Sequence, residues 1–362
     1  IAPKNINKNY RSIPVTIYKT YGKIPGIISL LILLLYLIPA SYILILGQLI
    51  SEMFSINQTI AIIIGVVFSS IYTLKGGFSS ILKTDRIQFV FMFLGFIMLF
   101  GMLIFSNDYG LHLINNLYNR DLELFKIPGN AQWSYIIMFA FLSLLTFLDP
   151  SFHQRTFAGK NLKTVQKSIL ISILLWFIFD FMTICSALFY IEIALENGLD
   201  PSNTSSPYIV LAKTVFGNHP ILMGIFFISI LSVVMSTIDS YAFLSAITLK
   251  YDLNTIVKKE TNIQDIQKAT ILIIIISFLL SSVFDRALSY WYYFGSYLLV
   301  SSFFPLIYAL FDIKTKNITF MMINSVIITL IWDILIINDL TEIPSIYIGL
   351  LSGFVIINFS RK

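Results

Sequence analysis

Charged residues are scarce in this sequence of 362 amino acids, in which Asp, Glu, Lys and Arg make up 12% and hydrophobic residues 57%. Soluble globular domains average about 25% charged residues, which excludes a soluble enzyme or a nucleic-acid-binding module. The net charge of +5 does not indicate nucleic acid as a partner, because the lysines lie in short segments between apolar runs. The composition therefore indicates a polytopic protein of the lipid bilayer.

Cysteine and histidine are also rare: the chain has one cysteine, Cys185, and three histidines. A single cysteine forms no internal disulfide, and the histidines are not spaced as a metal-binding set. The sequence shows no nucleophile with a neighbouring base, no carboxylate pair with a partner and no phosphate-binding glycine loop. We therefore expect a protein that is not an enzyme.

Long apolar runs take the place of these features. A helix needs about 17–25 residues to cross a hydrocarbon core of about 30 Å, and ten segments approach this length. The predicted spans are Ile24–Gln48, Thr59–Leu74, Ile87–Phe105, Trp133–Leu148, Ser168–Ile191, Ile221–Leu249, Ala269–Phe284, Leu288–Phe311, Ile318–Ile337 and Ile343–Phe359.

The positive charges predict how these spans are oriented. With a cytoplasmic N-terminal loop and ten alternating spans, the cytoplasmic segments hold all of the 24 Lys and Arg residues except Arg120, Lys126, Lys213 and Arg286. Cytoplasmic loops of membrane proteins carry such an excess of Lys and Arg. We predict a multi-pass protein of the cell membrane with a cytoplasmic N-terminal loop and C-terminus. The outer loop 192–220 contains SPYIVLAKTVFG, which predicts a short amphipathic helix.

Hydroxyl groups are concentrated in the sixth predicted span. Ser229, Ser232, Ser236 and Ser240 follow at spacings of three, four and four residues, which places them on one helical face. Such a face is typical of a seam of small residues where two membrane helices pack closely. Thr237 lies beside Ser236, and two adjacent hydroxyl oxygens are also suited to a hard cation such as sodium. The residue chemistry favours the two interpretations equally.

Acidic residues inside the spans form a second group, because ionisable residues at membrane depth are costly and mark pathways. Asp180, in the middle of the fifth span, is either a substrate or cation contact or a hydrogen-bonded structural acid. Asp149 precedes Pro150, which interrupts the fourth span. The interruption is either a broken helix of the kind that forms transporter sites or the end of the span, with Asp149 as a cap. Asp333, near the outer end of the ninth span, is expected to be either a residue of the membrane interface or a residue that packs between helices.

Three stretches resemble signature regions of the sodium/solute symporter family, whose members include proline, pantothenate and sugar symporters. They are GGFSSILKTDRIQ (Gly76–Gln88), DPSFHQRTFAGKN (Asp149–Asn161) and SVVMSTIDSYAFLSAITLKYDL (Ser232–Leu253). The resemblance implies an all-α, LeuT-type bundle in which two inverted repeats of five helices surround a midplane site. It assigns 1–106 to the first repeat, 107–312 to the outer loop and second repeat, and 313–362 to two C-terminal helices of one domain. The first helices of the first repeat are then missing, and part of the sodium coordination with them.

The resemblance also implies roles for residues near the cation path. The sodium ligands it implies are the backbone carbonyl of Val233 and the hydroxyls of Ser236 and Thr237. Asp85 matches an aspartate that is linked in the family to cation passage. For Asp239 we expect either a structural acid or a step in cation release.

The substrate positions implied by the resemblance lie in the fourth span. Leu145, Thr146 and Asp149 match residues that face substrate in sugar-type members. Leu145 replaces an aromatic residue of those members, which argues against a sugar. We add Asp180 to this set, since an acid there suits a cationic or amine-bearing solute.

The function expected on these grounds is sodium-coupled symport of a small organic solute by alternating access. Two alternatives stay open. One is a sensory or scaffold membrane domain that keeps the fold without transport. The other is a proton-coupled permease that uses Asp85, Asp180 or Asp239. The sequence does not predict the oligomeric state.

Overall fold

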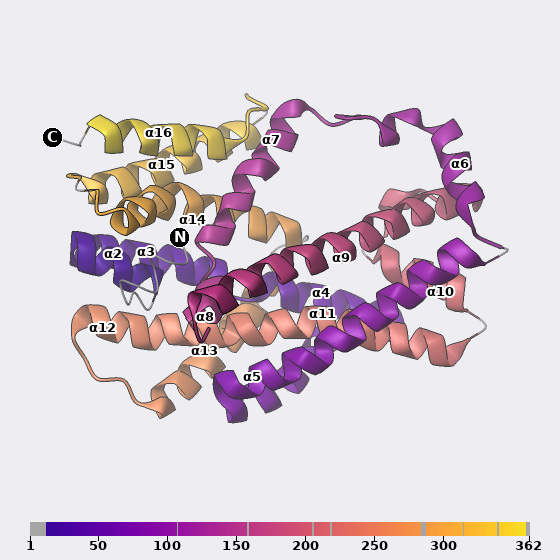
Figure 1. Ribbon diagram of the computed structural model, residues 1–362, viewed down its shortest axis with the longest axis horizontal. Coiled ribbons are helices and arrows are strands. Elements are labelled where there is room, and N and C mark those ends of the chain that lie inside the picture. The colour runs from indigo at the N-terminus through magenta and orange to yellow at the C-terminus, as the bar shows by residue number, and fades with distance from the viewer. Residues whose placement is uncertain are drawn as a thin grey trace. The chain divides into compact units, whose positions relative to one another are not determined.

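The computed structural model describes residues 12–106, 108–157, 159–204, 206–217, 219–283, 287–313, 315–338 and 340–359, apart from the side chains of 68–79, 157 and 203. In this part of the chain every regular element is a helix (Figure 1), as predicted. The helices form two compact units, here called unit 1 (residues 1–41, 131–165 and 241–362) and unit 2 (42–130 and 166–240).

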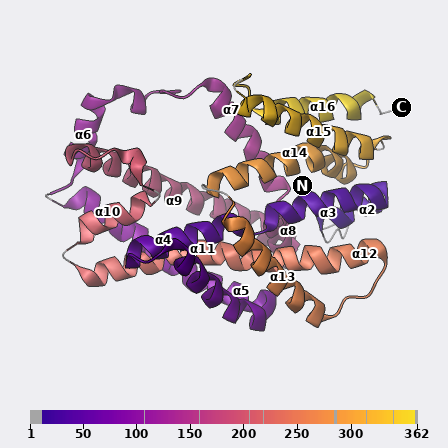
Figure 2. The same cartoon turned by 180° about the vertical axis from the view of Figure 1, so that it is seen from behind.

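Unit 1 contains the last three long helices of the chain and the first helices described. In both views α14, α15 and α16 lie side by side (Figure 2), and α3 packs against α2, α14 and α15. The unit comprises α2 (Ile13–Tyr21), α3 (Lys23–Leu37), α7 (Trp133–Leu142), η2 (Ser143–Phe147), α8 (Pro150–Phe157), η4 (Thr248–Asp252), α12 (Leu253–Val257), α13 (Ile263–Ser281), α14 (Ala287–Leu310), α15 (Ile318–Ile337) and α16 (Ser345–Phe359).

Unit 2 contains most of the two long helices that carry the predicted cation residues, α5 and α11. Its elements are α4 (Ala40–Phe54), α5 (Gln58–Phe105), α6 (Leu111–Arg120), η1 (Leu122–Phe125), α9 (Leu162–Glu196), η3 (Pro201–Asn203), α10 (Pro207–Phe216) and α11 (Pro220–Ile247). The first residues of α4 and α9 belong to unit 1, and α11 passes into unit 1 at Tyr241. The short outer helix predicted from the sequence is α10.

Local sequence signals explain where several helices begin and end. The Ser12 hydroxyl accepts a hydrogen bond from the Val15 amide and caps α2, and the Asn161 side chain accepts one from Thr164 and caps α9. α3 ends at Leu37 because Pro39 disfavours helical geometry in the residue before it and has no amide hydrogen to donate.

Each predicted span contains at least one helix among the described residues. Among the described residues, seven helices are long and apolar enough to cross a membrane, or eight if the bent pair Trp133–Phe147 and Pro150–Thr156 counts as one span. Two of the shorter apolar helices, Gln58–Val67 and Ser345–Phe359, lie in the remaining predicted spans. The packing role expected for Asp333 is confirmed, because the Tyr297 hydroxyl donates to its carboxylate at 2.7 Å and joins α14 to α15.

The connection between the second and third predicted spans differs from the expectation. We predicted a loop at 75–86, but α5 is continuous from Gln58 to Phe105, 48 residues. The helix is not straight, because Phe54 just before α5 and Phe96 within it contact the neighbouring residues Phe227 and Phe226 of α11, with ring centroids 5.5 Å apart in each pair.

Candidate functional site

The predicted interruption of the fourth span is present in unit 1. The helix pair on either side of it is bent by 43°. The Leu145 carbonyl accepts the amides of both Leu148 and Asp149, at 2.7 and 2.8 Å, which closes a tight turn. Asp149 then accepts the Ser151 amide at 2.8 Å and caps α8. The break and the cap, which the sequence left as alternatives, are therefore both features of this one segment.

The Asp149 carboxylate also joins the break to α11. The Tyr241 hydroxyl donates to its second oxygen at 2.7 Å, and Asp149 is only 6% exposed. The ring of Tyr241 lies 6.1 Å from that of Tyr36 on α3. Tyr241 thus connects the buried Asp149 carboxylate to α3 inside unit 1.

The other predicted substrate residues are placed differently. Leu145 is buried beside Gly295, where an added Cβ would lie 2.8 Å from the Leu145 side chain. Thr146 is exposed on the same turn. Asp180 belongs to unit 2, on α9, and its side chain is exposed in the middle of an apolar span. A carboxylate at that depth is costly in hydrocarbon, so we expect it to face protein or water in the membrane.

The predicted cation residues are brought together in unit 2. The Ser236 hydroxyl on α11 donates to the Asp85 carboxylate on α5 at 2.7 Å, across 151 positions of the sequence. The sequence named both residues on separate grounds and did not predict their contact. A carboxylate and a hydroxyl at hydrogen-bond distance form an oxygen pair that a hard cation can share.

Thr237 and Val233 extend this pair along α11. The Thr237 hydroxyl donates to the Val233 carbonyl at 3.3 Å, so the two predicted oxygen ligands are adjacent. Ser232, on the packing face, bonds to the Ile228 carbonyl of its own helix at 2.7 Å. On α11, the hydroxyls of Ser232 and Thr237 thus bond to carbonyls of their own helix, whereas the hydroxyl of Ser236 bonds to α5.

The packing face predicted for α11 is confirmed at Ser229. This residue is fully buried, and its hydroxyl donates to the Met92 carbonyl of α5 at 3.0 Å. Gly95 permits the close approach, because a Cβ at this position would lie 2.3 Å from the Ser229 Cβ. The small residues hold the two helices at the separation that the Ser236–Asp85 bond requires.

Two further polar residues lie within one helical turn of this bond. Asp239 follows Ser236 by three residues and is fully buried. Gln88 follows Asp85 by three residues, and its side-chain oxygen is buried with no hydrogen-bond partner among the described residues. Sequence reasoning missed Gln88, although it ends the stretch KTDRIQ that contains Asp85. Its position one turn from an assigned acid is the signal that identifies it.

The possible cation ligands in this region are all oxygen atoms: hydroxyls, a backbone carbonyl, carboxylates and an amide oxygen. Oxygen ligands suit hard cations, whereas His and Cys suit transition metals. Among the described residues no group of three or more His, Cys, Asp and Glu is placed to hold a metal ion. Oxygen atoms of these kinds are suited to a hard cation such as sodium.

Comparison with known proteins identifies the family of the chain. A model of the sodium:solute symporter family matches residues 1–334. The chain is similar to the sodium/pantothenate symporter of Haemophilus influenzae, with 27% identity over 59% of this chain and 44% of the relative. It is also similar to the high-affinity proline transporter PutP of Bacillus subtilis, with 27% identity over 53% of this chain and 40% of the relative. The osmoregulated proline transporter OpuE of Bacillus subtilis is 24% identical over 57% of this chain and 42% of the relative. The matches cover less than half of each relative's length.

The same fold occurs among solved structures. The substrate-bound outward-open state of a Na+-coupled sialic acid symporter matches 99% of this chain and 79% of that chain, with a TM-score of 0.77 and 16% identity. This likeness shows an all-helical fold of the predicted LeuT type.

Proposed function

Because the chain belongs to the sodium:solute symporter family, we propose that it performs sodium-coupled symport of a small organic solute by alternating access. It acts as a transporter and not as an enzyme. The observation that carries the proposal is the contact of Ser236 on α11 with Asp85 on α5, since it unites two residues expected on the cation path. One charge moving through about 100 mV supplies about 2.3 kcal/mol to drive the solute.

The proposed sodium ligands on α11 are the Val233 carbonyl and the hydroxyls of Ser236 and Thr237. Asp85 accepts the Ser236 hydroxyl and receives the ion as it leaves these ligands. Asp239, buried one turn further along α11, continues the path. Hydroxyl and carbonyl oxygens replace water around sodium at little cost when they are already held in place.

The proposed solute site lies at the interruption of the fourth span, with Leu145, Thr146 and Asp149 as contacts. The buried Asp149 supports it, because a broken helix near a carboxylate offers charge and free backbone groups together. Asp180 is our further candidate for a solute contact. Proline and pantothenate, named for the curated relatives, are the first solutes to test.

Two features of the arrangement complete the proposal. Both chain ends face the cytoplasm, as the excess of Lys and Arg predicts. The division into 1–106, 107–312 and 313–362 follows the family's repeats. The two compact units described above reflect packing and do not test that division.

Sodium binding by the purified full-length protein tests this function directly. Thermal unfolding is measured in sodium, potassium and choline salts at constant ionic strength, and uptake of proline and pantothenate into proteoliposomes is followed with and without a sodium gradient. We expect a sodium-specific rise in unfolding temperature that is weakened in Ser236→Ala and Thr237→Ala. Ser232→Ala is the control, since its hydroxyl bonds within α11.

The competing functions predict other outcomes. Uptake that follows a proton gradient without sodium would identify a proton-coupled permease. If uptake and the sodium-specific shift in unfolding temperature are both absent, this result favours a domain that keeps the fold without transport.

A further inference from the structure

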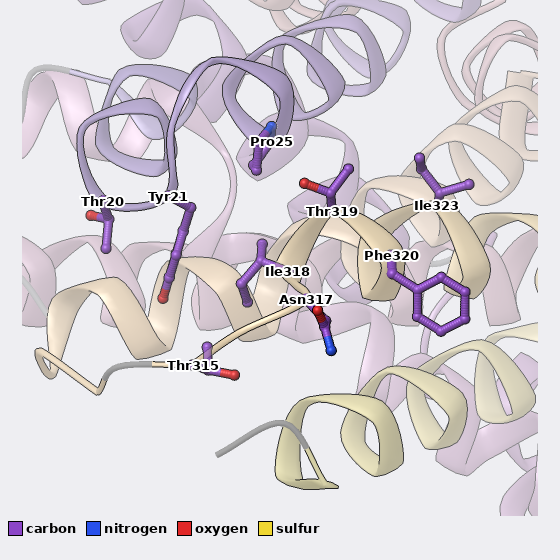
Figure 3. Close-up of a pocket in the computed structure, with 9 residues that line it drawn as sticks. All are labelled: Thr20, Tyr21, Pro25, Thr315, Asn317, Ile318, Thr319, Phe320 and Ile323. Carbon is purple, nitrogen blue, oxygen red and sulfur yellow. The ribbon is translucent and has the colours of Figure 1, made fainter. Parts of the chain in front are cut away.

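Unit 1 contains a cavity at one end of its long helices. The cavity has a volume of about 680 Å³ and is lined by Thr20, Tyr21, Pro25, Thr315, Asn317, Ile318, Thr319, Phe320 and Ile323. Thr20 and Tyr21 of α2 and Pro25 of α3 face Thr319, Ile318 and Ile323 at the start of α15 (Figure 3). None of these residues is among those assigned to sodium or solute.

The cavity lies where membrane helices begin. α3 and α15 are candidate membrane spans that start at Lys23 and Ile318. α14 ends at Leu310, just before the loop that supplies Thr315. We therefore infer that the cavity lies near the boundary between hydrocarbon and water, where lipid headgroups are found.

Positive charge surrounds the lining residues in the sequence. Lys19 and Lys23 flank Thr20 and Tyr21, Lys316 stands beside Thr315 and Asn317, and all three lysines are exposed. None of the nine lining residues is acidic. The nearest described acid in sequence is Asp312, on the loop that leads to Thr315. This end of unit 1 is thus complementary to an anionic group.

Apolar side chains occupy the adjacent surface. Ile24 and Phe320 are each 61% exposed and Ile323 is 43% exposed. They stand on α3 and α15, in the first turns that enter the membrane. Such residues suit contact with acyl chains directly below a headgroup.

The cavity is held by a packed core. Ile318 and Met322 of α15 are buried with Tyr308 of α14 and Ile357 of α16, and Tyr21 packs against this cluster. The Tyr21 hydroxyl also donates to the Pro305 carbonyl at 3.3 Å. These contacts hold Tyr21 and Ile318, which line the cavity, in position.

We propose that this cavity binds an anionic phospholipid. Lys19, Lys23 and Lys316 attract its phosphate, while Thr319 and Asn317 offer polar groups to the headgroup. The acyl chains descend along Phe320 and Ile323. The inference goes beyond symport and rests on charge, since the cytoplasmic leaflet carries anionic lipids that attract lysines near its surface.

A lipid titration of the purified full-length protein tests the proposal. Thermal unfolding in detergent is measured while dioleoyl phosphatidylglycerol is added, and dioleoyl phosphatidylcholine and soluble glycerol phosphate are titrated in parallel. We expect a saturable rise in unfolding temperature with phosphatidylglycerol only. In the variant K19Q/K23Q/K316Q the half-saturating concentration rises about tenfold or more.

Matched variants separate a site from general charge attraction. K160Q/K163Q/K167Q removes three exposed lysines at the start of α9 and is expected to change half-saturation less than about twofold. Thr319→Leu keeps every charge but narrows the cavity, and we expect it to weaken the binding of phosphatidylglycerol.

Three results would overturn the proposal. The first is an equal loss in both lysine variants, and the second is equal stabilisation by phosphatidylcholine or glycerol phosphate. The third is unchanged binding in both K19Q/K23Q/K316Q and Thr319→Leu. Since sodium stabilisation is measured separately, failure of the lipid site does not affect the proposed transport function.

Discussion

The hydroxyl of Ser236 donates a 2.7 Å hydrogen bond to the carboxylate of Asp85, which joins α11 to α5 inside unit 2. The two residues lie in stretches that the sequence marked for different reasons. Their contact turns two separate expectations into one candidate site.

Replacing Asp85 by Asn preserves the size of the side chain and its ability to accept from Ser236, but removes the negative charge. We expect the half-saturating sodium concentration to rise about tenfold, equivalent to about 1.4 kcal/mol, because the cation loses a charged partner. Sodium-dependent unfolding temperature measures the change. Asp108→Asn, in the loop after α5, is the control. An equal rise in half-saturating sodium concentration in this variant would contradict a role for Asp85 in the cation path.

Gln88→Leu is expected to act in opposite directions on stability and on sodium binding. Its buried oxygen lacks a partner among the described residues, and such an atom costs about 1–3 kcal/mol. In potassium the variant should therefore be as stable as the native protein or more stable. In sodium the variant should lose part of the stabilisation that the ion provides, because the Gln88 oxygen no longer contacts the cation.

The control for Gln88→Leu is Gln58→Leu, an exposed glutamine on the same helix. This variant should leave the sodium-dependent shift unchanged. A Gln88→Leu protein that is destabilised equally in both salts would mean that Gln88 has a structural role only.

Gly95→Ala should loosen the contact between α5 and α11. The added methyl group would lie 2.3 Å from the Ser229 Cβ, so the helices must shift, at a cost of about 1–3 kcal/mol. Gly101→Ala on the same helix meets no atom within 4 Å and serves as the control. Thermal unfolding compares the two, and Ser229→Gly should restore part of the stability lost in Gly95→Ala.

Tyr241→Phe tests the link between the broken span and α11. It removes the hydroxyl that donates to the buried Asp149, which leaves a carboxylate oxygen without this partner and costs about 1–3 kcal/mol. Solute affinity should fall along with stability, because the turn at the proposed solute site is no longer anchored. The exposed Tyr118→Phe is the comparison. Unchanged stability and uptake would separate Tyr241 from the site.

The orientation is tested with single cysteines. In a Cys185→Ser background, Ser202→Cys and Lys316→Cys place a thiol in the loops predicted outside and inside. A membrane-impermeant thiol reagent added to intact cells should label position 202 and spare position 316. The reverse pattern would invert the proposed topology, and with it the leaflet that supplies the lipid.

The sequence alone determined the class of protein and much of its fold. Apolar length predicts membrane helices because the hydrocarbon thickness sets it, and the dipeptide Asp149–Pro150 predicts the break because proline geometry is local. The stretches around Asp85 and Ser236 point to the family that the family model confirms. Each of these signals is contained in a short window of residues.

Only the tertiary structure decided which polar residues meet. The partners of Ser236 and Tyr241 are 151 and 92 positions away, and contacts at such separations depend on how helices pack, which no local pattern encodes. The Gln88 oxygen, which has no hydrogen-bond partner in the described part of the chain, and the cavity beside Thr319 are likewise properties of packed neighbours. The helical continuity of α5 through 75–86 also escaped prediction, since polar residues mark the edge of hydrocarbon but do not by themselves end a helix.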